Sequence, residues 1–242
     1  MLCYLPALFL GLFDLDEGAF AATSLQMIKQ NQYLVPYIGE ELRLEKPILT
    51  YWIQAISMSI FGANEFALRI PSVIASFFWG FYFADFVKRY IKNSSRSEIF
   101  LNLLTIPGIF IISFAATAEA LLNLFITLLM INIYDYSERK DKKYLIWSGI
   151  FVGLGFLTKG LTIIAIGGMI SLIYFIYQRK LIIFFNIVFS WRSWLSFLIV
   201  VLPWVITLYQ NIGLSELDYL FLGQTFGRFT NTFEKHDGPF FY

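Results

Sequence analysis

Long apolar runs separated by short polar segments fill the chain from residue 70 to residue 209. A helix needs about 20 consecutive apolar residues to cross the hydrocarbon core of a bilayer, and several windows approach or exceed that length. The pattern therefore predicts membrane-spanning helices at 70–91, 99–116, 119–134, 144–157, 161–177 and 194–209. The predicted fold class is all-α, a polytopic helical membrane protein with amphipathic helices on the membrane surface.

The residues ahead of these spans form a predicted outer loop, residues 14–69. The apolar run 1–13 is too short to cross a bilayer, and we interpret it as the tail of a truncated first helix. Apolar residues then recur at helical spacing and predict a short amphipathic surface helix: Phe20, Ala21, Leu25 and Ile28. An extended turn is expected around Gly39.

A second surface helix is predicted between Pro47 and Gly62, because proline suits a first helical turn and glycine suits a helix end. One face of this helix is expected to gather a set of residues at helical spacing, Ile48, Tyr51, Trp52, Ala55, Ile56 and Ser59. The tyrosine and tryptophan suit the headgroup level of a membrane.

The whole chain, 1–242, is interpreted as a single transmembrane module that is truncated at both ends. Residues 211–242 form a predicted second outer loop. The segment 153–160 contains glycines and a lysine without the spacing of a phosphate-binding loop. We interpret its glycines as positions where neighbouring membrane helices approach closely.

Composition agrees with a membrane protein and excludes several kinds of site. Hydrophobic residues make up 58% of the chain and aromatic residues 19%, above the roughly half apolar content of soluble domains. A net charge of +1 without a basic stripe argues against nucleic acid as a partner. Cys3 is the only cysteine and His236 the only histidine, which excludes an internal disulfide and a multi-histidine metal site. The sequence identifies no cofactor and leaves a divalent metal ion open.

Lysines and arginines predict the orientation, since cytoplasmic loops are enriched in them. When alternate connections are assigned to opposite sides, one side receives Lys88, Arg89, Lys92, Arg96, Arg139, Lys140, Lys142, Lys143, Arg179, Lys180 and Arg192. That side is predicted to be cytoplasmic. We expect a multi-pass protein of the cell inner membrane, with its active site facing the periplasm or exterior. Asp85 is expected to pair with the basic end of its own helix, and Arg69 to anchor at the lipid headgroups.

Charged residues that lie far apart in the sequence meet on the predicted outer face. They are Asp14, Asp16, Glu17, Glu45, Lys46, Glu119 and Lys159, with Arg228 and His236 of the last loop as further substrate-binding candidates. Glu119 and Lys159 are isolated opposite charges at one predicted depth, so we expect them to pair. A structural salt bridge is the alternative for this pair, and helix capping is the alternative for the first acids.

Carboxylates and cations at this level suit the transfer of a sugar from a lipid carrier. A carboxylate can take the proton from an acceptor hydroxyl, while cations stabilise a phosphate that leaves with its lipid. Lys46, Lys159 and Arg228 lie at the predicted depth where the single phosphate of such a donor needs positive charge. We therefore interpret the chain as an integral membrane glycosyltransferase with a polyprenyl-phosphate sugar donor.

Several segments, in this order, carry a family resemblance: "DLDEGAFAATSLQMI", "LEKPILTYWIQA", "FGANEFALRIPS", "TAEALLNLF", "GFLTKG" and "HDGPFFY". The chain resembles the aminoarabinose transferases and protein O-mannosyltransferase-like proteins, which are GT-C membrane glycosyltransferases. The resemblance implies a lipid A-like, glycan or protein acceptor and a reaction on the outer side of the cytoplasmic membrane. It implies that Asp16 is the acid nearest the reacting hydroxyl, supported by Glu17 and Asp14. The residues implied for the donor site are Glu45, Lys46, Glu119 and Lys159.

Two other functions fit parts of this pattern. A transporter or flippase of lipid-linked sugars also needs charges in the membrane, but near the bilayer midplane and beside paired broken helices. An inactive fragment or non-catalytic scaffold would keep the fold without the reaction. The informative charges lie at one face, which favours the enzyme, and the identities of the sugar and the acceptor are left open.

Overall fold

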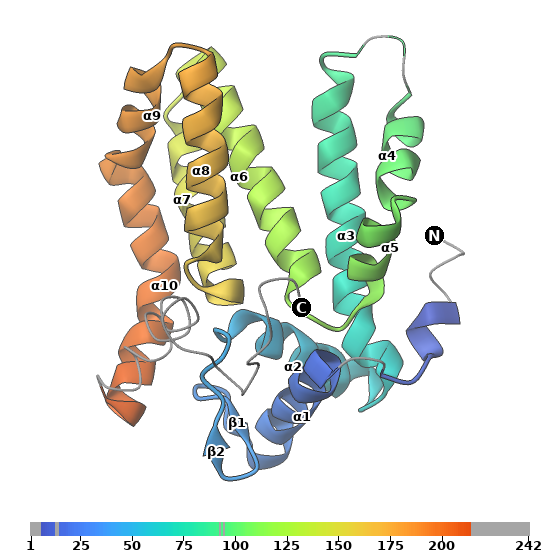
Figure 1. Cartoon of the computed structure of the whole chain (residues 1–242). Coiled ribbons are helices and arrows are strands. Elements are labelled where there is room, and N and C mark those ends of the chain that lie inside the picture. The colour runs from blue at the N-terminus through green and yellow to red at the C-terminus, as the bar shows by residue number, and fades with distance from the viewer. Residues whose placement is uncertain (1–5, 13–14, 92, 94, 214–242) are drawn as a thin grey trace, which may run out of the picture.

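The computed structural model describes residues 6–12, 15–91, 93 and 95–213, and helices make up most of it (Figure 1). A bundle of long helices stands over a smaller layer of short helices and a β-hairpin at its lower end. The predicted all-α membrane fold is confirmed, because several of the helices are long and apolar enough to cross a bilayer.

The lower layer contains the two predicted surface helices, α1 Leu15–Gln30 and α2 Leu49–Phe61. Helix α2 ends at Gly62 as expected, and it begins just after Pro47. The described part of the run 1–13 holds the short 3-10 helix η2 Pro6–Phe9.

A β-hairpin links α1 to α2 where the sequence predicts an extended turn. Strand β1 Tyr37–Ile38 pairs antiparallel with β2 Glu41–Leu42. Gly39 lies between them with a φ of 62°, a left-handed conformation that glycine adopts without strain. Both backbone groups of Gly39 bind the side chain of Gln26, at 2.8 Å and 2.7 Å, which fixes the hairpin to α1.

The buried residues of α2 do not coincide with the face that the spacing picks out. Ile56, a member of that face, is 61% exposed, whereas Gln54 is buried. Gln54 has polar partners inside the protein, since it donates to the Ala116 carbonyl at 2.9 Å and accepts from the Ser24 hydroxyl at 3.0 Å. These partners come from distant segments, so the local pattern does not reveal them.

The bundle contains helices at five of the predicted spans: α3 Glu65–Lys88, α6 Glu119–Arg139, α7 Lys143–Lys159, α8 Thr162–Tyr177 and α10 Trp191–Ile212. Of these, α3, α6 and α10 have the length and hydropathy to cross a membrane. Helix α3 starts several residues before its predicted span because the Asn64 side chain caps it, accepting from Ala67 N at 2.9 Å.

The predicted span at 99–116 is not one continuous helix. The segment forms α4 Arg96–Leu104 and α5 Pro107–Phe114, which are bent by 81°. Pro107 has no amide hydrogen to continue the first helix, and it forces the preceding Ile106 into an extended conformation, with a ψ of 123°. A short helix that the sequence analysis missed, α9 Leu181–Val188, precedes α10.

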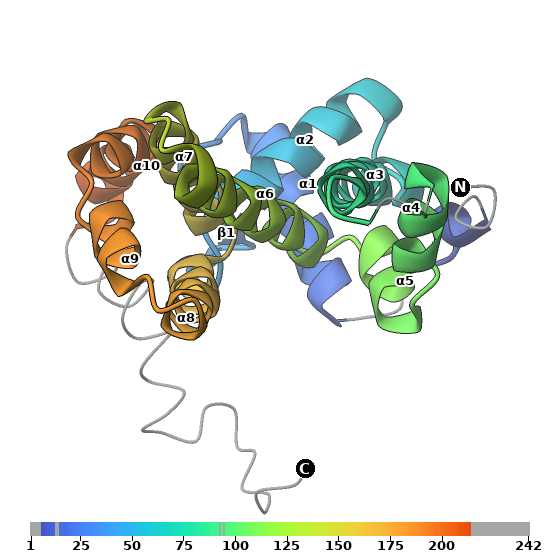
Figure 2. The same cartoon turned by 90° about the horizontal axis from the view of Figure 1, so that it is seen from above.

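Seen from above, α6 occupies the middle of the molecule (Figure 2). Helices α3, α4 and α5 lie on one side of α6, and α7 to α10 lie on the other. Close packing among α7, α8 and α10 uses glycines of the 153–160 segment, as expected: a Cβ at Gly153 would lie 2.9 Å from Val200 of α10, and one at Gly155 would collide with Ile163 of α8.

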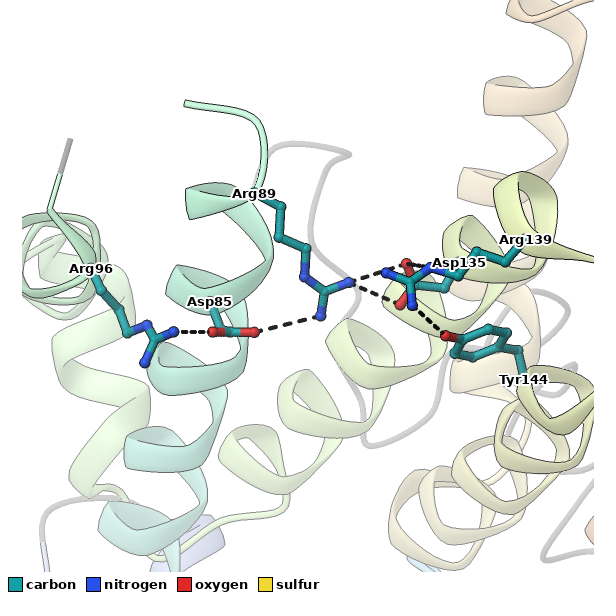
Figure 3. A network of polar contacts seen from close by, with 6 residues as sticks. All are labelled: Asp85, Arg89, Arg96, Asp135, Arg139 and Tyr144. Atoms are coloured by element: carbon teal, nitrogen blue, oxygen red, sulfur yellow. Dashed lines mark hydrogen bonds and ion pairs between the residues drawn. The ribbon is translucent and has the colours of Figure 1, made fainter. Parts of the chain in front are cut away.

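Charged side chains join the two sides at the upper end of the bundle (Figure 3). Arg89, which directly follows α3, contacts the Asp135 carboxylate of α6 at 3.0 Å. The expected pairing of Asp85 is confirmed, since it binds Arg89 at 3.5 Å and also Arg96. Arg139 continues this network to Tyr144 of α7 at 3.1 Å.

Candidate active site

Those predicted outer-face charges that the structure describes lie at the lower end of the bundle, where α6 begins, α7 ends and the surface layer lies against them (Figure 1). The segment before α6 holds both surface helices through one residue, Ala116. Its amide donates to Glu17 of α1 at 2.7 Å, and its carbonyl accepts from Gln54 of α2 at 2.9 Å. Asp16 is adjacent to Glu17, and Glu119 lies three residues after Ala116. The hydrogen bond between Ala116 and Glu17 therefore brings the segments that carry Asp16 and Glu119 together.

The expected pairing of Glu119 with Lys159 is confirmed. The lysine ammonium donates to Oε1 of the glutamate, although the two residues are 40 positions apart. Their side chains are 37% and 27% exposed, so the pair remains open to a small ligand. The neighbouring Gly160 lies against Pro47, since a Cβ there would be 3.9 Å from the proline ring. This contact brings the Glu45–Lys46 segment next to the end of α7.

Glu17 makes a buried ion pair with Arg69 that the sequence analysis missed. Arg69 Nε lies 3.1 Å from Oε1 and Nη2 lies 2.8 Å from Oε2, and both side chains are fully buried. Arg69 also donates to the carbonyls of Leu10 and Gly11, at 2.6 Å and 3.0 Å. The expectation that Arg69 anchors at the lipid headgroups is wrong, because its side chain is 0% exposed.

This geometry gives Glu17 a structural role, and the supporting catalytic role expected for it stays a prediction. Both carboxylate oxygens are engaged by Arg69, and Oε1 also accepts from the amide of Ala116. A carboxylate bound in this way joins the start of α1 to α3 and to the segment before α6. Helix capping, the alternative considered for this acid, is not its main role.

Asp16, the neighbour of Glu17 in the first turn of α1, is exposed. One turn further, Phe20 packs against Tyr51 of α2 in a tilted ring contact, with centroids 5.1 Å apart. Burial raises the pKa of Tyr51 to about 12; nearby Arg43 opposes the rise, and the negative charges of Glu45 and Asp16 add to it. The negative charges of Asp16 and Glu45 therefore both act on the Tyr51 hydroxyl.

Arg43, which follows β2, connects these groups. Its Nε donates to the Tyr51 hydroxyl at 3.1 Å, and its Nη2 lies 3.1 Å from Oε2 of Glu45. The sequence analysis missed Arg43 and Tyr51. A signal existed for Arg43, because residues 43 and 45 alternate with Leu44 in an extended segment and so point to the same side.

Lys46 is half-buried beside Glu45 at the same end of the molecule. The other predicted site residues, Asp14, Arg228 and His236, lie outside the described residues. Among residues 6–12, 15–91, 93 and 95–213, no cluster of three or more His, Cys, Asp or Glu side chains could hold a metal ion.

Comparison with known proteins matches residues 45–207 to the family described as dolichyl-phosphate-mannose-protein mannosyltransferase. The chain is 29% identical, over 96% of its length, to the undecaprenyl phosphate-alpha-4-amino-4-deoxy-L-arabinose arabinosyl transferase of Photorhabdus laumondii, of which it covers 42%. It is 31% identical, again over 96% of its length, to the Aeromonas hydrophila protein of the same name, of which it covers 43%. The chain thus spans less than half the length of these curated relatives.

The fold also matches a solved structure. The crystal structure of ArnT from Cupriavidus metallidurans bound to undecaprenyl phosphate superimposes with a TM-score of 0.81 at 16% sequence identity. The match covers 93% of this chain and 43% of that one. At this identity the match supports a common fold.

Proposed function

Because the chain belongs to the dolichyl-phosphate-mannose-protein mannosyltransferase family, we propose that it is an integral membrane glycosyltransferase that takes a sugar from a polyprenyl-phosphate donor. The names of its relatives favour undecaprenyl phosphate as the carrier and 4-amino-4-deoxy-L-arabinose, a pentose, as the sugar. A lipid A-like molecule is the favoured acceptor. We place the reaction at the outer face of the cell inner membrane, because the basic connections lie at the opposite end of the bundle.

One observation carries this proposal: exposed acid and fixed cations share the lower end of the bundle. Asp16 opens α1 there, and the Glu119–Lys159 pair lies where α6 begins and α7 ends. Lys46 lies near this pair through the contact between Pro47 and Gly160. A transferase needs this combination, because it must accept a proton and stabilise a departing phosphate in one place.

In the proposed reaction the acceptor hydroxyl attacks the anomeric carbon of the donor sugar. The bond from that carbon to the acceptor oxygen forms while the bond to the phosphate oxygen breaks. Asp16 takes the hydroxyl proton, and the phosphate leaves with its lipid and an additional negative charge. Lys46 and Lys159 stabilise this charge. We keep Asp14 as a supporting catalytic acid, and Arg228 and His236 as substrate-binding candidates.

A transporter of lipid-linked sugars is the weaker candidate. The bent pair α4–α5 has the geometry of a broken span or a re-entrant loop, and transporters contain broken spans. Transporters use such helices in pairs around charges at the bilayer midplane, however, and the exposed charges here lie at the two ends of the bundle.

The test is the variant Asp16→Asn in the full-length gene product, reconstituted in proteoliposomes with undecaprenyl-phosphate aminoarabinose and lipid A. Removing a general base lowers the rate of sugar transfer by about 100-fold or more. Asp141→Asn is the matched control, because Asp141 is exposed in the α6–α7 connection at the opposite end. Transfer at the wild-type rate by Asp16→Asn would contradict the assignment of Asp16 as the general base.

A further inference from the structure

Arg43 and Arg69 make different use of the same chemical group. Each guanidinium carries hydrogens on Nε, Nη1 and Nη2. In Arg69 all three nitrogens donate to protein acceptors, and the side chain is fully buried. In Arg43, Nε and Nη2 are engaged by Tyr51 and Glu45, whereas Nη1 has no acceptor among the described residues. Arg43 therefore keeps donors for a ligand.

The position of Arg43 is fixed from several directions. Its amide donates to the Pro36 carbonyl at 2.9 Å, which holds the chain at the end of the hairpin. The hairpin is bound to α1 through Gln26, as described above. Tyr51, whose hydroxyl accepts the hydrogen bond from Nε, is fully buried in α2. A guanidinium held in this way loses little conformational freedom when it binds an anion.

The surroundings of Arg43 are those of the proposed reaction. Phe20 contacts Tyr51 and lies four residues after Asp16, so Asp16 and Phe20 share one face of α1. The Arg43 guanidinium, bound to the Tyr51 hydroxyl, therefore lies on the side of α1 from which Asp16 projects. Glu45 is followed in the sequence by Lys46 and then by Pro47, which lies next to Gly160 at the end of α7.

We propose that Arg43 forms a phosphate-binding site, in which its guanidinium holds the phosphate of the polyprenyl donor beside Asp16. Tyr51 and Glu45 are positioning residues that orient the guanidinium. This inference rests on the proposed function. Arginine suits the task because it stays charged when it is 10% exposed, as Arg43 is, and Nη1 can donate to a phosphate oxygen, while the phosphate gains negative charge as the sugar leaves. Arg43 then stabilises the transition state more than the bound donor.

The test measures binding of undecaprenyl phosphate to the chain in nanodiscs, with undecaprenol as the ligand that lacks the phosphate. Arg43→Met should weaken binding of undecaprenyl phosphate by about tenfold or more and leave binding of undecaprenol unchanged. Arg43→Lys keeps the charge without the planar group and should show a smaller loss. In the transfer assay, Arg43→Met should raise KM for the donor and also lower kcat.

Arg139→Met is the matched control, because Arg139 also contacts a tyrosine hydroxyl at 3.1 Å, that of Tyr144, but at the opposite end of the bundle. It should bind both lipids as the wild type does. If Arg43→Met weakened the binding of both lipids equally, or weakened neither, the proposed phosphate site would be overturned. If Arg43→Met does not fold, the same two lipids are compared in Arg43→Lys, which should bind undecaprenyl phosphate more weakly than the wild type and undecaprenol equally well. Wild-type chain that binds undecaprenyl phosphate no better than undecaprenol would contradict the proposed function instead.

Discussion

At the scale of single residues, the buried pair of Glu17 and Arg69 shows how charge is used to join distant segments. Its two side chains lie 52 positions apart and are fully enclosed. Burying a charge is costly unless a partner and hydrogen bonds compensate it, and here every guanidinium nitrogen has an acceptor. The pair is therefore strongly coupled, and losing one member leaves the other charge buried and unpaired.

We expect Arg69→Met to lower the free energy of unfolding by about 3–5 kcal/mol, the usual effect of removing one partner from a buried ion pair. The measurement is denaturant or thermal unfolding of the purified chain in detergent micelles. Arg96→Met is the control, since its side chain is 52% exposed in its ion pair with Asp85 and should cost about 1 kcal/mol or less. Similar losses for the two variants would contradict the structural role of the buried pair.

At the scale of elements, glycine sets the distance between α7 and α10. Gly149 faces the Ser193 carbonyl, and Gly153 faces Val200, where an added Cβ would lie 2.9 Å from the valine side chain. Membrane helices associate without a hydrophobic driving force between them, so close backbone contact and packing matter more than in water. Contacts of this kind hold α10 beside α7, whose last residue is Lys159.

Gly149→Ala should therefore destabilise the bundle, because the added methyl group cannot fit 2.1 Å from a backbone carbonyl without moving α10. We expect a loss of about 1–3 kcal/mol, typical of overpacking, measured as a lower Tm in micelles. Gly168→Ala on α8 is the matched control, since a Cβ there meets nothing within 4 Å. That variant should be neutral or slightly stabilising, because alanine favours helix. A neutral Gly149→Ala would show that α10 does not pack as described.

At the scale of the whole molecule, the two ends of the bundle carry different polar groups. The upper end has the network from Asp85 to Tyr144 (Figure 3), which ties α3 to α6 and α6 to α7. The lower end has the partly exposed charges of the candidate site and the surface layer. The excess of lysine and arginine at the upper end predicts that this end faces the cytoplasm.

The orientation can be tested with single cysteines in a Cys3→Ser background. Glu40→Cys lies in the exposed hairpin turn, and Asp141→Cys lies in the exposed α6–α7 connection. In intact cells whose outer membrane is made permeable, a membrane-impermeant thiol reagent should label Glu40→Cys and spare Asp141→Cys. Both cysteines should react after the inner membrane is opened. The reverse labelling pattern would invert the topology and move the candidate site to the cytoplasm.

The elements whose cause is local could be predicted from the sequence. Apolar length predicted α3, α6, α7, α8 and α10, because the bilayer imposes a minimum run of apolar residues on any helix that crosses it. Helical spacing predicted α1, and proline and glycine bounded α2. The sequence also placed Glu119 and Lys159 at one depth, because both interrupt apolar runs at corresponding helix ends. The break at Pro107 had a local signal that span length obscured.

Which charges are buried and which remain exposed for chemistry depends on the folded arrangement of the chain. Asp16 and Glu17 are adjacent acids with the same local context, yet one is exposed and the other is enclosed by Arg69. Arg43 gained its place at the candidate site through Tyr51 and the hairpin. The physical reason is that the cost of burying a charge depends on the partners that surround it, and those partners come from segments that meet only in the folded chain.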